Sequence, residues 1–319
     1  MRSNLLAGHD CGAESRYGPE IRQFLYTPAD FNRVRELLYK SAGIALGPNK
    51  RDMVYSRLAR RLRCRGVGTF SEYIDLVENG DHQEFEAFIN ALTTNLTAFF
   101  RESHHFPILA QHMGSIGRGR NIRIWSCAAS TGEEPYSLAM TAVEHFDSFN
   151  PPVAIFASDI DTNVLERAER GVYPIEHVQK LSPGRLKRFF LKGDGKHAGF
   201  VKVRPELRKL ITFRRLNLLD VNWSIGERFD AIFCRNVMIY FDMGTQYRIL
   251  KKFVPLLQPD GLLFAGHSES YHHADDLFRI RQKTVYVLNS DGRPADGGRS
   301  GYSWTWSGRA HDNQSLNHR

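Results

Sequence analysis

The chain has 319 residues, of which 42% are hydrophobic and 24% charged, with a formal net charge of +8 and a mean hydropathy of −0.40. This composition is ordinary for a globular protein, and the length favours two domains over one. No apolar run reaches the roughly 18 residues of a membrane span, which argues against membrane insertion, and the N-terminus has no apolar signal stretch, so we expect a cytoplasmic protein.

The N-terminal part is predicted to be helical. We expect a disordered stub over residues 1–27 and a helical domain over residues 28–90, because apolar residues recur there at helical spacing in four segments. Gly43 and Gly66 are stop signals after the first two segments. A linking segment over residues 91–121 follows.

The net charge is concentrated in this helical part. Between Arg33 and Arg65, ten Lys and Arg residues stand against two acids, an excess equal to that of the whole chain. Such a concentration predicts an acidic partner, whether nucleic acid, an anionic membrane surface or an acidic protein helix.

From residue 122 to about residue 288, short apolar strands alternate with helical segments. The strand candidates are "IRIWSC", "VAIFASD", "ITFRRLNL", "FDAIFCR", "GLLFAGH" and "KTVYVL". This alternation predicts an α/β fold with a doubly wound, Rossmann-like parallel sheet. Ligands of such sheets bind outside the carboxyl ends of the strands, where the strand order switches.

Two segments depart from the alternation. Residues 186–206 hold the glycine-punctuated turn "GDGKHAG" between the β-prone stretches "RFFLK" and "FVKVR". They predict a small antiparallel β-subdomain inserted in the sheet domain. Residues 289–319 are rich in Gly, Ser and Arg and poor in aliphatic residues, so we expect a disordered tail.

The four cysteines, Cys11, Cys64, Cys127 and Cys234, are scattered and form no C-x-x-C pair. We therefore expect no metal site and no disulfide framework, which fits a reducing cytosol. Cys127 and Cys234 lie in apolar, strand-like runs and are expected to be small buried hydrophobes.

The loop after the first strand, "CAASTGEE", places small residues before two glutamates at a helix start. The G-x-G-x-x-G fingerprint is missing, because Gly132 is the only glycine of the loop, and this argues against NAD or FAD. Glu133 is placed to meet a positive or hydroxyl-bearing group. For Glu134 we expect only a favourable interaction with the helix dipole.

Asp159 ends the second strand, where nucleotide-binding sheets place a carboxylate that accepts hydrogen bonds from the ribose hydroxyls. Alone, this acid is equally well explained as a turn or cap residue. With Glu133 and without a pyrophosphate cradle, it favours S-adenosylmethionine, which carries adenosine, a sulfonium and an ammonium but no phosphate.

Five longer stretches carry a resemblance to a known family. They are "ALTTNLTAFFRESHHFPIL", "ASTGEEPYSLAM", "FASDIDTNVLERA", "FDAIFCRNVMIYFD" and "PDGLLFAGHSES". In this order they resemble the chemotaxis receptor methyltransferases of the CheR family, from about residue 28 to about residue 288. The resemblance implies a methyltransferase sheet that binds S-adenosylmethionine, together with an all-helical N-terminal domain.

The resemblance also implies site residues. The implied cofactor contacts are Asn95, Thr97, Arg101, Glu133, Asp159, Asn217, Leu218, Arg235 and Asn236. Arg101 and Tyr240 are the implied catalytic residues, with Tyr240 near the transferred methyl group. Without the family, Asn95 and Thr97 would be interpreted as helix caps and Tyr240 as a core aromatic.

The family methylates glutamate side chains of methyl-accepting chemotaxis receptors, which forms methyl esters in sensory adaptation. A glutamate with a pKa of about 4.3 is already ionised at pH 7, so no catalytic base is needed. The protein then has to align oxygen, methyl carbon and sulfur and to exclude water.

The resemblance assigns partners to two further features. Arg57, Arg60 and Arg61 are predicted to contact the glutamate-rich methylation helices of a chemoreceptor, with a solvated basic face as the alternative. Gly193 and Gly195 resemble the glycine turn of members that dock a peptide from the receptor's C-terminal tail. We expect a monomer that is recruited to receptor arrays at the inner face of the membrane.

Three other functions are weaker alternatives. A nucleic-acid methyltransferase would use the basic helices, but the chain lacks a D/N-P-P-Y-type tetrad and interleaves only Tyr55 with the arginines. No nucleic-acid partner is therefore expected. A non-catalytic adaptor would not need the set of Glu133, Asp159, Arg235 and Asn236, and a dehydrogenase would need the missing glycine fingerprint.

Overall fold

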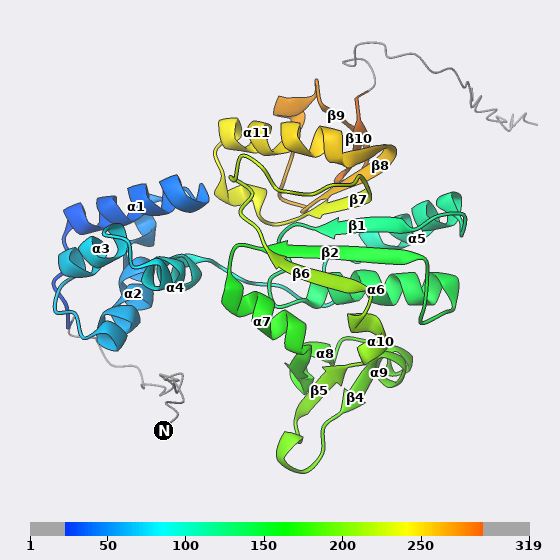
Figure 1. Cartoon of the computed structure of the whole chain (residues 1–319), viewed down its shortest axis with the longest axis horizontal. Coiled ribbons are helices and arrows are strands. Elements are labelled where there is room, and N and C mark those ends of the chain that lie inside the picture. The colour runs from blue at the N-terminus through cyan, green and yellow to red at the C-terminus, as the bar shows by residue number, and fades with distance from the viewer. Residues whose placement is uncertain (1–22, 290–319) are drawn as a thin grey trace, which may run out of the picture.

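The computed structural model describes residues 23–289, which form a bundle of helices and a larger α/β part (Figure 1). Most of the predicted disordered stub and tail, residues 1–22 and 290–319, lies outside these described residues. The predicted end of the stub at residue 27 is wrong, because Phe24 and Tyr26 are buried in the core of the helical bundle. No helix between residues 23 and 289 has the length and apolar character required to cross a membrane.

The helical bundle consists of four α-helices and a short 3-10 turn. They are α1 (Pro28–Ala42), η1 (Pro48–Lys50), α2 (Arg51–Arg65), α3 (Phe70–Glu78) and α4 (His82–Leu92). Thr27 and Asp30 form a capping box at the start of α1, and Gly43 ends that helix with a left-handed φ of 69°. The apolar stripe of α2, including Leu58 and Leu62, is buried in the bundle core. The predicted helical domain is thus present.

The main sheet has seven strands in the order β6-β2-β1-β7-β8-β10-β9. Their bounds are β1 (Ile122–Ser126), β2 (Val153–Asp159), β6 (Ile211–Arg215), β7 (Phe229–Cys234), β8 (Leu257–Ala265), β9 (Phe278–Gln282) and β10 (Val285–Leu288). The chain winds outward from β1 through β2 to β6 and then returns to the other side of β1 with β7, so the order switches between β1 and β7.

The doubly wound sheet is confirmed, with one correction at its edge. The first five strands in the spatial order are parallel, whereas β10 runs antiparallel to both β8 and β9. Strand β9 was not predicted, because four of its five residues are exposed and its sequence shows no apolar run.

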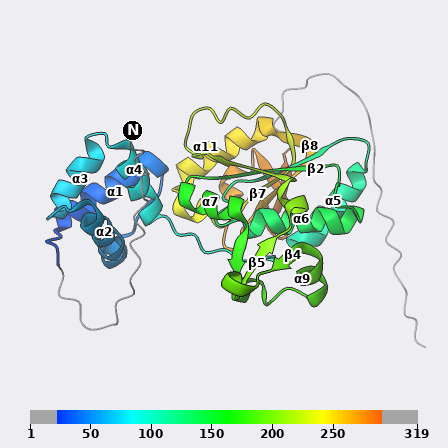
Figure 2. The same ribbon diagram turned by 60° about the horizontal axis from the view of Figure 1, so that its bottom comes forward.

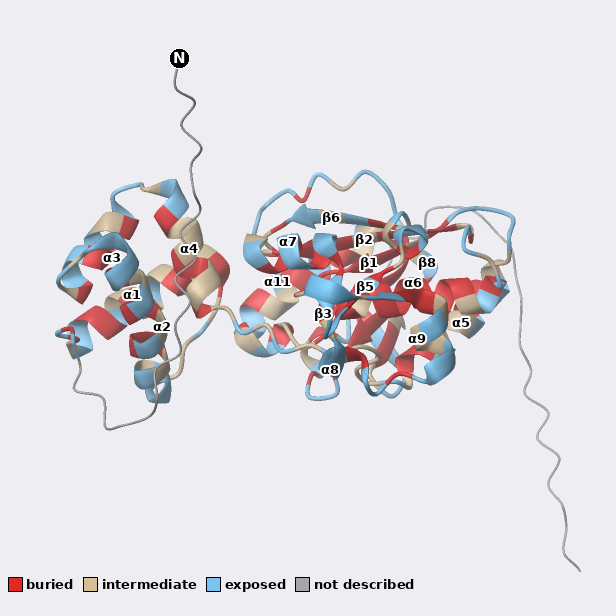
Figure 3. Ribbon diagram, turned by 90° about the horizontal axis from the view of Figure 1, so that it is seen from below, coloured by how far each residue is buried: buried red, intermediate tan, exposed pale blue. Residues whose placement is uncertain are grey.

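Helices cover both faces of the sheet (Figure 2). Helices α5 (His105–Ile116) and α6 (Glu133–Phe146) share a core with one face, and α11 (Met243–Phe253) shares a core with the other. Ile124 and Trp125, neighbours on β1, belong to these two opposite cores. Figure 3 shows the buried residues gathered along the central strands and on the inner sides of the helices. Helix α5 lies within the predicted linking segment yet packs onto the sheet.

The predicted inserted hairpin is present and is part of a small three-stranded sheet of order β3-β5-β4. Its strands are β3 (Val172–Pro174), β4 (Phe190–Lys192) and β5 (Phe200–Val203), and short helices α8 (Ile175–Val178), α9 (Pro183–Phe189) and α10 (Pro205–Arg208) surround it. The turn requires Gly193, because a Cβ there would lie 2.1 Å from the carbonyl oxygen of His197. Of this sheet only β3 was not predicted, because it lies outside the glycine-punctuated hairpin and pairs with β5 from an earlier part of the chain.

Candidate functional site

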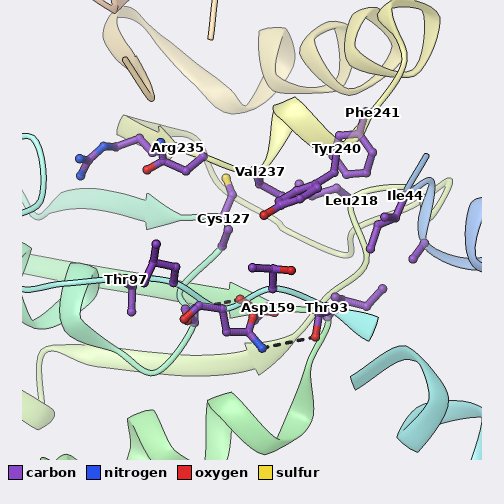
Figure 4. Close-up of a pocket in the computed structure, with 18 of the residues that line it drawn as sticks. Ile44, Thr93, Thr97, Cys127, Asp159, Leu218, Arg235, Val237, Tyr240 and Phe241 are labelled. Carbon is purple, nitrogen blue, oxygen red and sulfur yellow. Dashed lines mark hydrogen bonds between the residues drawn. The ribbon is translucent and has the colours of Figure 1, made fainter. Parts of the chain in front are cut away.

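A concave site lies at the carboxyl ends of β1, β2, β6 and β7, where the strand order switches. Its cavity of about 290 Å³ is at the small end of the range for small-molecule sites. The helical bundle closes one side with Ala42, Ile44, Leu46 and Met53. Residues 93–98, which we call the interdomain segment, form another wall. In Figure 4, Ile44, Leu218 and Tyr240 lie on one side, and Asp159 and Thr93 face them.

Nine of the predicted site residues line this pocket: Asn95, Thr97, Arg101, Asp159, Asn217, Leu218, Arg235, Asn236 and Tyr240. They come from five different segments of the chain. Glu133 is not among the lining residues, whereas Glu134 is. The predicted partner-contacting residues Arg57, Arg60, Arg61, Gly193 and Gly195 lie elsewhere in the structure.

The loop before α6 uses two of the backbone amides near its middle for hydrogen bonds to β2. The N–H of Ala129 donates to the Ser158 carbonyl at 2.9 Å, and the N–H of Ser130 donates to Asp159 Oδ2 at 2.8 Å. Gly132 is required by its φ of 98° and because a Cβ would lie 2.9 Å from the Cβ of Ala168. The loop therefore packs against the end of β2, and its amides are used within the protein.

Asp159 is a buried carboxylate at the end of β2. Its two oxygens accept hydrogen bonds from the backbone N–H groups of Ser130 and Asp161, at 2.8 and 3.0 Å. Burial raises the pKa of Asp159 to about 6, although these two hydrogen bonds oppose the shift. Each carboxylate oxygen has a second acceptor site, so Asp159 can still accept hydroxyl donors from a ligand.

Arg235, which lines the pocket, is held between two acids. Its Nη1 donates to Glu134 Oε2 at 2.9 Å, and its Nη2 lies 3.3 Å from Glu102 Oε2. The same Nη2 donates to the backbone carbonyl of Arg101. Burial raises the pKa of Glu134, and the Arg235 charge opposes that shift. Arg235 thus supports the segment that carries Arg101. Because two acids surround this one arginine, a net negative charge remains near the pocket.

The expectation for Glu134 is therefore corrected, because its side chain does more than interact with the helix dipole. It accepts a hydrogen bond from Ser126 at 2.7 Å and pairs with Arg235. Glu133 instead accepts one from Thr131 and lies 3.4 Å from Nδ1 of His177 on α8. Successive helical residues point about 100° apart, so the sequence could not show which of the two acids faces the pocket.

Hydrogen bonds join the helical bundle to the sheet on two sides of the pocket. On one side, Asn217 Nδ2 donates to the Ser41 carbonyl at 2.8 Å and the Ala45 N–H donates to the Tyr240 carbonyl at 3.0 Å. On the other, Asp161 accepts hydrogen bonds from Thr93 and Asn95 of the interdomain segment. Sequence reasoning missed Asp161, which lies two residues beyond Asp159 and resembles an ordinary helix cap.

Two of the three predicted partner-contacting arginines are engaged inside the bundle. Arg61 makes a bidentate ion pair with the buried Glu84, at 3.0 and 2.6 Å. Arg57 donates to the carbonyls of Leu92 and Thr93 at the end of α4. Arg60 is exposed on the surface of α2.

The basic segment is also partly neutralised by acids of α3 and α4. These ion pairs are Arg33 with Asp75 and Glu78, and Arg65 with Asp81. The acids follow the basic segment in the chain, so a count confined to residues 33–65 overstated the charge of the folded surface.

The predicted burial of two cysteines is confirmed. Cys127 and Cys234 are buried at the ends of β1 and β7, and Cys64 is exposed. Cys11 lies outside the described residues. Between residues 23 and 289, no cluster of three or more His, Cys, Asp or Glu side chains could hold a metal ion.

The lining residues fit S-adenosylmethionine. The buried Asp159 and the largely buried Glu134 supply acceptors and negative charge, and Ile44, Leu218 and Phe241 supply apolar surface for an adenine ring. The backbone N–H groups of Ala129, Ser130 and Gly132 in the loop are already hydrogen-bonded within the protein, so these amides are not available to a pyrophosphate.

Comparison with known proteins agrees with this fit. The all-alpha domain of CheR methyltransferases matches residues 29–93, and their SAM binding domain matches residues 95–287. The chain belongs to the CheR methyltransferase family. S-adenosylmethionine is accordingly its cofactor, bound by the sheet domain.

Several curated relatives align along most of the chain. A chemotaxis protein methyltransferase of Escherichia coli K12 is 51% identical over 88% of this chain and 98% of its own length. A chemotaxis protein methyltransferase 2 of Pseudomonas aeruginosa is 55% identical over 83% of this chain and 95% of its own length. A probable chemotaxis protein methyltransferase of Rhizobium etli is 39% identical over 73% and 89%, respectively.

Proposed function

We propose that this methyltransferase transfers the methyl group of S-adenosylmethionine to glutamate side chains of methyl-accepting chemotaxis receptors, forming glutamyl methyl esters. The observation that carries the proposal is the convergence of two kinds of residue on one pocket. Two acids, the buried Asp159 and the largely buried Glu134, suit the cationic donor, whereas Arg101 and Tyr240 suit an incoming carboxylate. The names of the curated relatives supply the chemotactic setting.

The pocket chemistry agrees with an acceptor that is already ionised. No histidine is among the described residues that line the cavity. Burial keeps the pKa of Cys127 well above its ordinary value, so this thiol is not a ready base. A glutamate carboxylate needs no base, since its pKa of about 4.3 leaves it ionised at pH 7.

The cofactor supplies an activated methyl group on a sulfonium. The protein residues then orient the acceptor and exclude water. Arg101 is held by a 2.7 Å hydrogen bond from its Nη1 to the Leu96 carbonyl, and its remaining N–H groups are suited to a carboxylate. Tyr240, half-buried on η3 (Met238–Tyr240), would lie beside the transferred methyl group.

The decisive experiment is transfer of radiolabel from the methyl donor to receptor-bearing membranes. We expect label in the receptor band that is released as methanol by mild base, because carboxylate esters are base-labile. Membranes from a strain without chemoreceptors are the control. Label that resists base, or that appears equally in the control membranes, would show that the acceptor is a different group or protein.

For the receptor contact, we propose the exposed basic surface of α2, with Arg60 as its central residue. The glutamate-rich helices of a chemoreceptor are complementary in charge to this surface. Arg57 and Arg61 would contribute their positive charge from partly buried positions, since their side chains are already hydrogen-bonded within the bundle.

We also propose that the small β3-β5-β4 sheet docks a peptide from the receptor tail. Strand β5 lies in the centre, so β3 and β4 are the open edges to which an extended peptide can add. Gly193 and Gly195 shape the turn beside β4. NMR titration with an aromatic-bearing tail peptide should shift the signals of β4 and its turn, and a scrambled peptide should not. Unchanged signals would remove this contact.

A further inference from the structure

We propose that Asp161 is a positioning residue that sets which atom of Asn95 faces the cofactor pocket. It does so by turning the Asn95 amide, so that the pocket receives a hydrogen-bond acceptor from position 95. This inference rests on the proposed function, because Asn95 is taken to contact the methyl donor.

The two oxygens of Asp161 have separate tasks. Oδ1 caps α7 (Thr162–Arg170) by accepting hydrogen bonds from the backbone N–H groups of Asn163 and Val164, at 3.0 and 3.3 Å. Oδ2 makes no bond to that helix. It accepts instead from Thr93 Oγ1 at 2.9 Å and from Asn95 Nδ2 at 2.8 Å. A residue that only capped the helix would need one oxygen. The second oxygen of Asp161 instead binds the interdomain segment.

Burial makes this arrangement specific. Asp161 is 2% exposed, so water cannot replace a lost partner at little cost. A carboxylate only accepts hydrogen bonds, so the Asn95 amide has to present its NH₂ group to it. The second hydrogen of that group points to Thr93 Oγ1 at 3.3 Å. The carbonyl oxygen is then the side-chain atom of Asn95 that remains for a ligand.

The loop before α6 also helps to fix the position of Asn95. Its backbone carbonyl accepts a hydrogen bond from Ser130 Oγ at 3.2 Å, and the N–H of Asp161 donates to Asp159. Asp161 therefore links the interdomain segment to the acid at the end of β2. A hydrogen-bond acceptor at position 95 suits S-adenosylmethionine, which carries positive charge and hydroxyl groups. An NH₂ group at that position would not suit it.

Three variants of the full chain separate this role from helix capping. Asp161→Ser keeps a good N-cap residue but lacks the second oxygen. Asp161→Asn keeps the capping oxygen but presents an NH₂ group to Asn95, whose amide has to turn over. Asp161→Asn combined with Asn95→Asp reverses the pair and again leaves an oxygen for the pocket. Ser182→Ala, which removes a cap from α9 away from the pocket, is the control for capping alone.

Binding of S-adenosylmethionine and of S-adenosylhomocysteine is measured by calorimetry, with the thermal midpoint as a check on folding. We expect Asp161→Ser and Asp161→Asn to weaken donor binding about ten-fold, the typical effect of one lost buried hydrogen bond. The reversed pair should recover most of the affinity. Asp161→Asn should weaken binding of the cationic S-adenosylmethionine more than binding of S-adenosylhomocysteine, whose sulfur is neutral.

Wild-type affinity in both single variants, with only a lower thermal midpoint, would make Asp161 a plain helix cap and overturn the proposal. So would a loss in Asp161→Asn that the reversed pair does not recover. Failure of the unaltered protein to bind the donor would count against the cofactor site itself, which keeps the two failures distinguishable.

Discussion

Burial of Asp159 disfavours the ionised form that its predicted role in ligand binding requires. The residue is buried, which disfavours its charge and raises its pKa to about 6, yet its predicted role is to accept ribose hydroxyls, which the ionised form does best. Because the folded pKa lies above the unfolded value of about 3.9, the stability that Asp159 contributes is complete below pH 4 and is lost as pH rises through 6. Cofactor binding should shift this balance towards the carboxylate.

The first prediction follows for binding as a function of pH. Affinity for S-adenosylhomocysteine should rise about ten-fold between pH 5 and pH 7 and level off above, with proton release on binding near pH 6. Calorimetry in buffers of different ionisation enthalpy measures both quantities. Asp159→Asn should bind weakly with little pH dependence. A flat wild-type profile would mean that Asp159 is not the group that accepts the ribose.

A second prediction at this scale concerns Arg101 and Tyr240. Tyr240→Phe and Arg101→Ala should lower the turnover rate at least ten-fold while changing the affinity for S-adenosylhomocysteine less than three-fold, because both act on the acceptor in the transition state. Single-turnover methylation and calorimetry provide the two numbers. Small and equal effects on both would contradict these catalytic roles.

At the scale of elements, α2 shows how a basic helix is divided between structure and recognition. Arg61 and the buried Glu84 hold α2 against α4, and Tyr73 also donates to Glu84 at 2.7 Å. Arg60 and Arg63 point outward from the same helix and are exposed. The helix therefore contains arginines of both kinds at adjacent positions.

The third prediction tests the structural half of α2. Arg61→Ala should lower the free energy of unfolding by about 2 kcal/mol, because it leaves Glu84 buried with fewer partners, and partial exposure of Arg61 softens the loss. Urea denaturation gives the value. Arg60→Ala is the matched control, expected within about 0.5 kcal/mol of wild type. An equal effect of the two substitutions would contradict the division of the α2 arginines into structural and recognition residues.

The fourth prediction tests the recognition half. Reversing the charge of Arg60 and Arg63 to Glu should reduce receptor methylation several-fold while binding of S-adenosylhomocysteine stays intact, since neither residue lines the pocket. The loss should diminish at high salt, where screening weakens the attraction in the unaltered protein. Unchanged receptor methylation at physiological salt would leave α2 as a solvated basic face.

At the scale of the whole molecule, the pocket belongs to neither domain alone. The sheet supplies Asp159, Asn217 and Tyr240, and the bundle supplies the wall that contains Ile44 and Leu46. The hydrogen bonds from Asn217 and Ala45 connect the two parts next to the pocket. A ligand bound there contacts both, so its binding energy should also stabilise the way they pack.

The fifth prediction is a joint effect on hydrogen exchange. Adding S-adenosylhomocysteine should slow exchange of peptides covering residues 41–47 and 93–98 as well as those covering residues 235–241. The Asp159→Asn variant, with weakened binding, serves as the control and should show little change. Protection confined to the sheet peptides would indicate that the bundle does not close the site.

Most of the helices and strands and most of the candidate site could be predicted from the sequence. Helical periodicity, Gly43, Gly66 and the apolar strand runs are local features, and local propensity and burial pattern decide where such elements form. The carboxyl ends of parallel strands meet at one edge, which is why Asp159 could be assigned to the site, whereas Asn217, Arg235 and Tyr240 were implied by the resemblance to the CheR family.

The contacts that these side chains make could be established only from the folded structure. Glu134 rather than Glu133 faces the pocket, Arg61 is paired with an acid twenty-three residues away, and Asp161 reaches across to Asn95. The edge strand β9 could also be recognised only from its pairing with β10. Each of these outcomes depends on what lies opposite a residue in space, and spacing along one chain carries no information about the opposite partner.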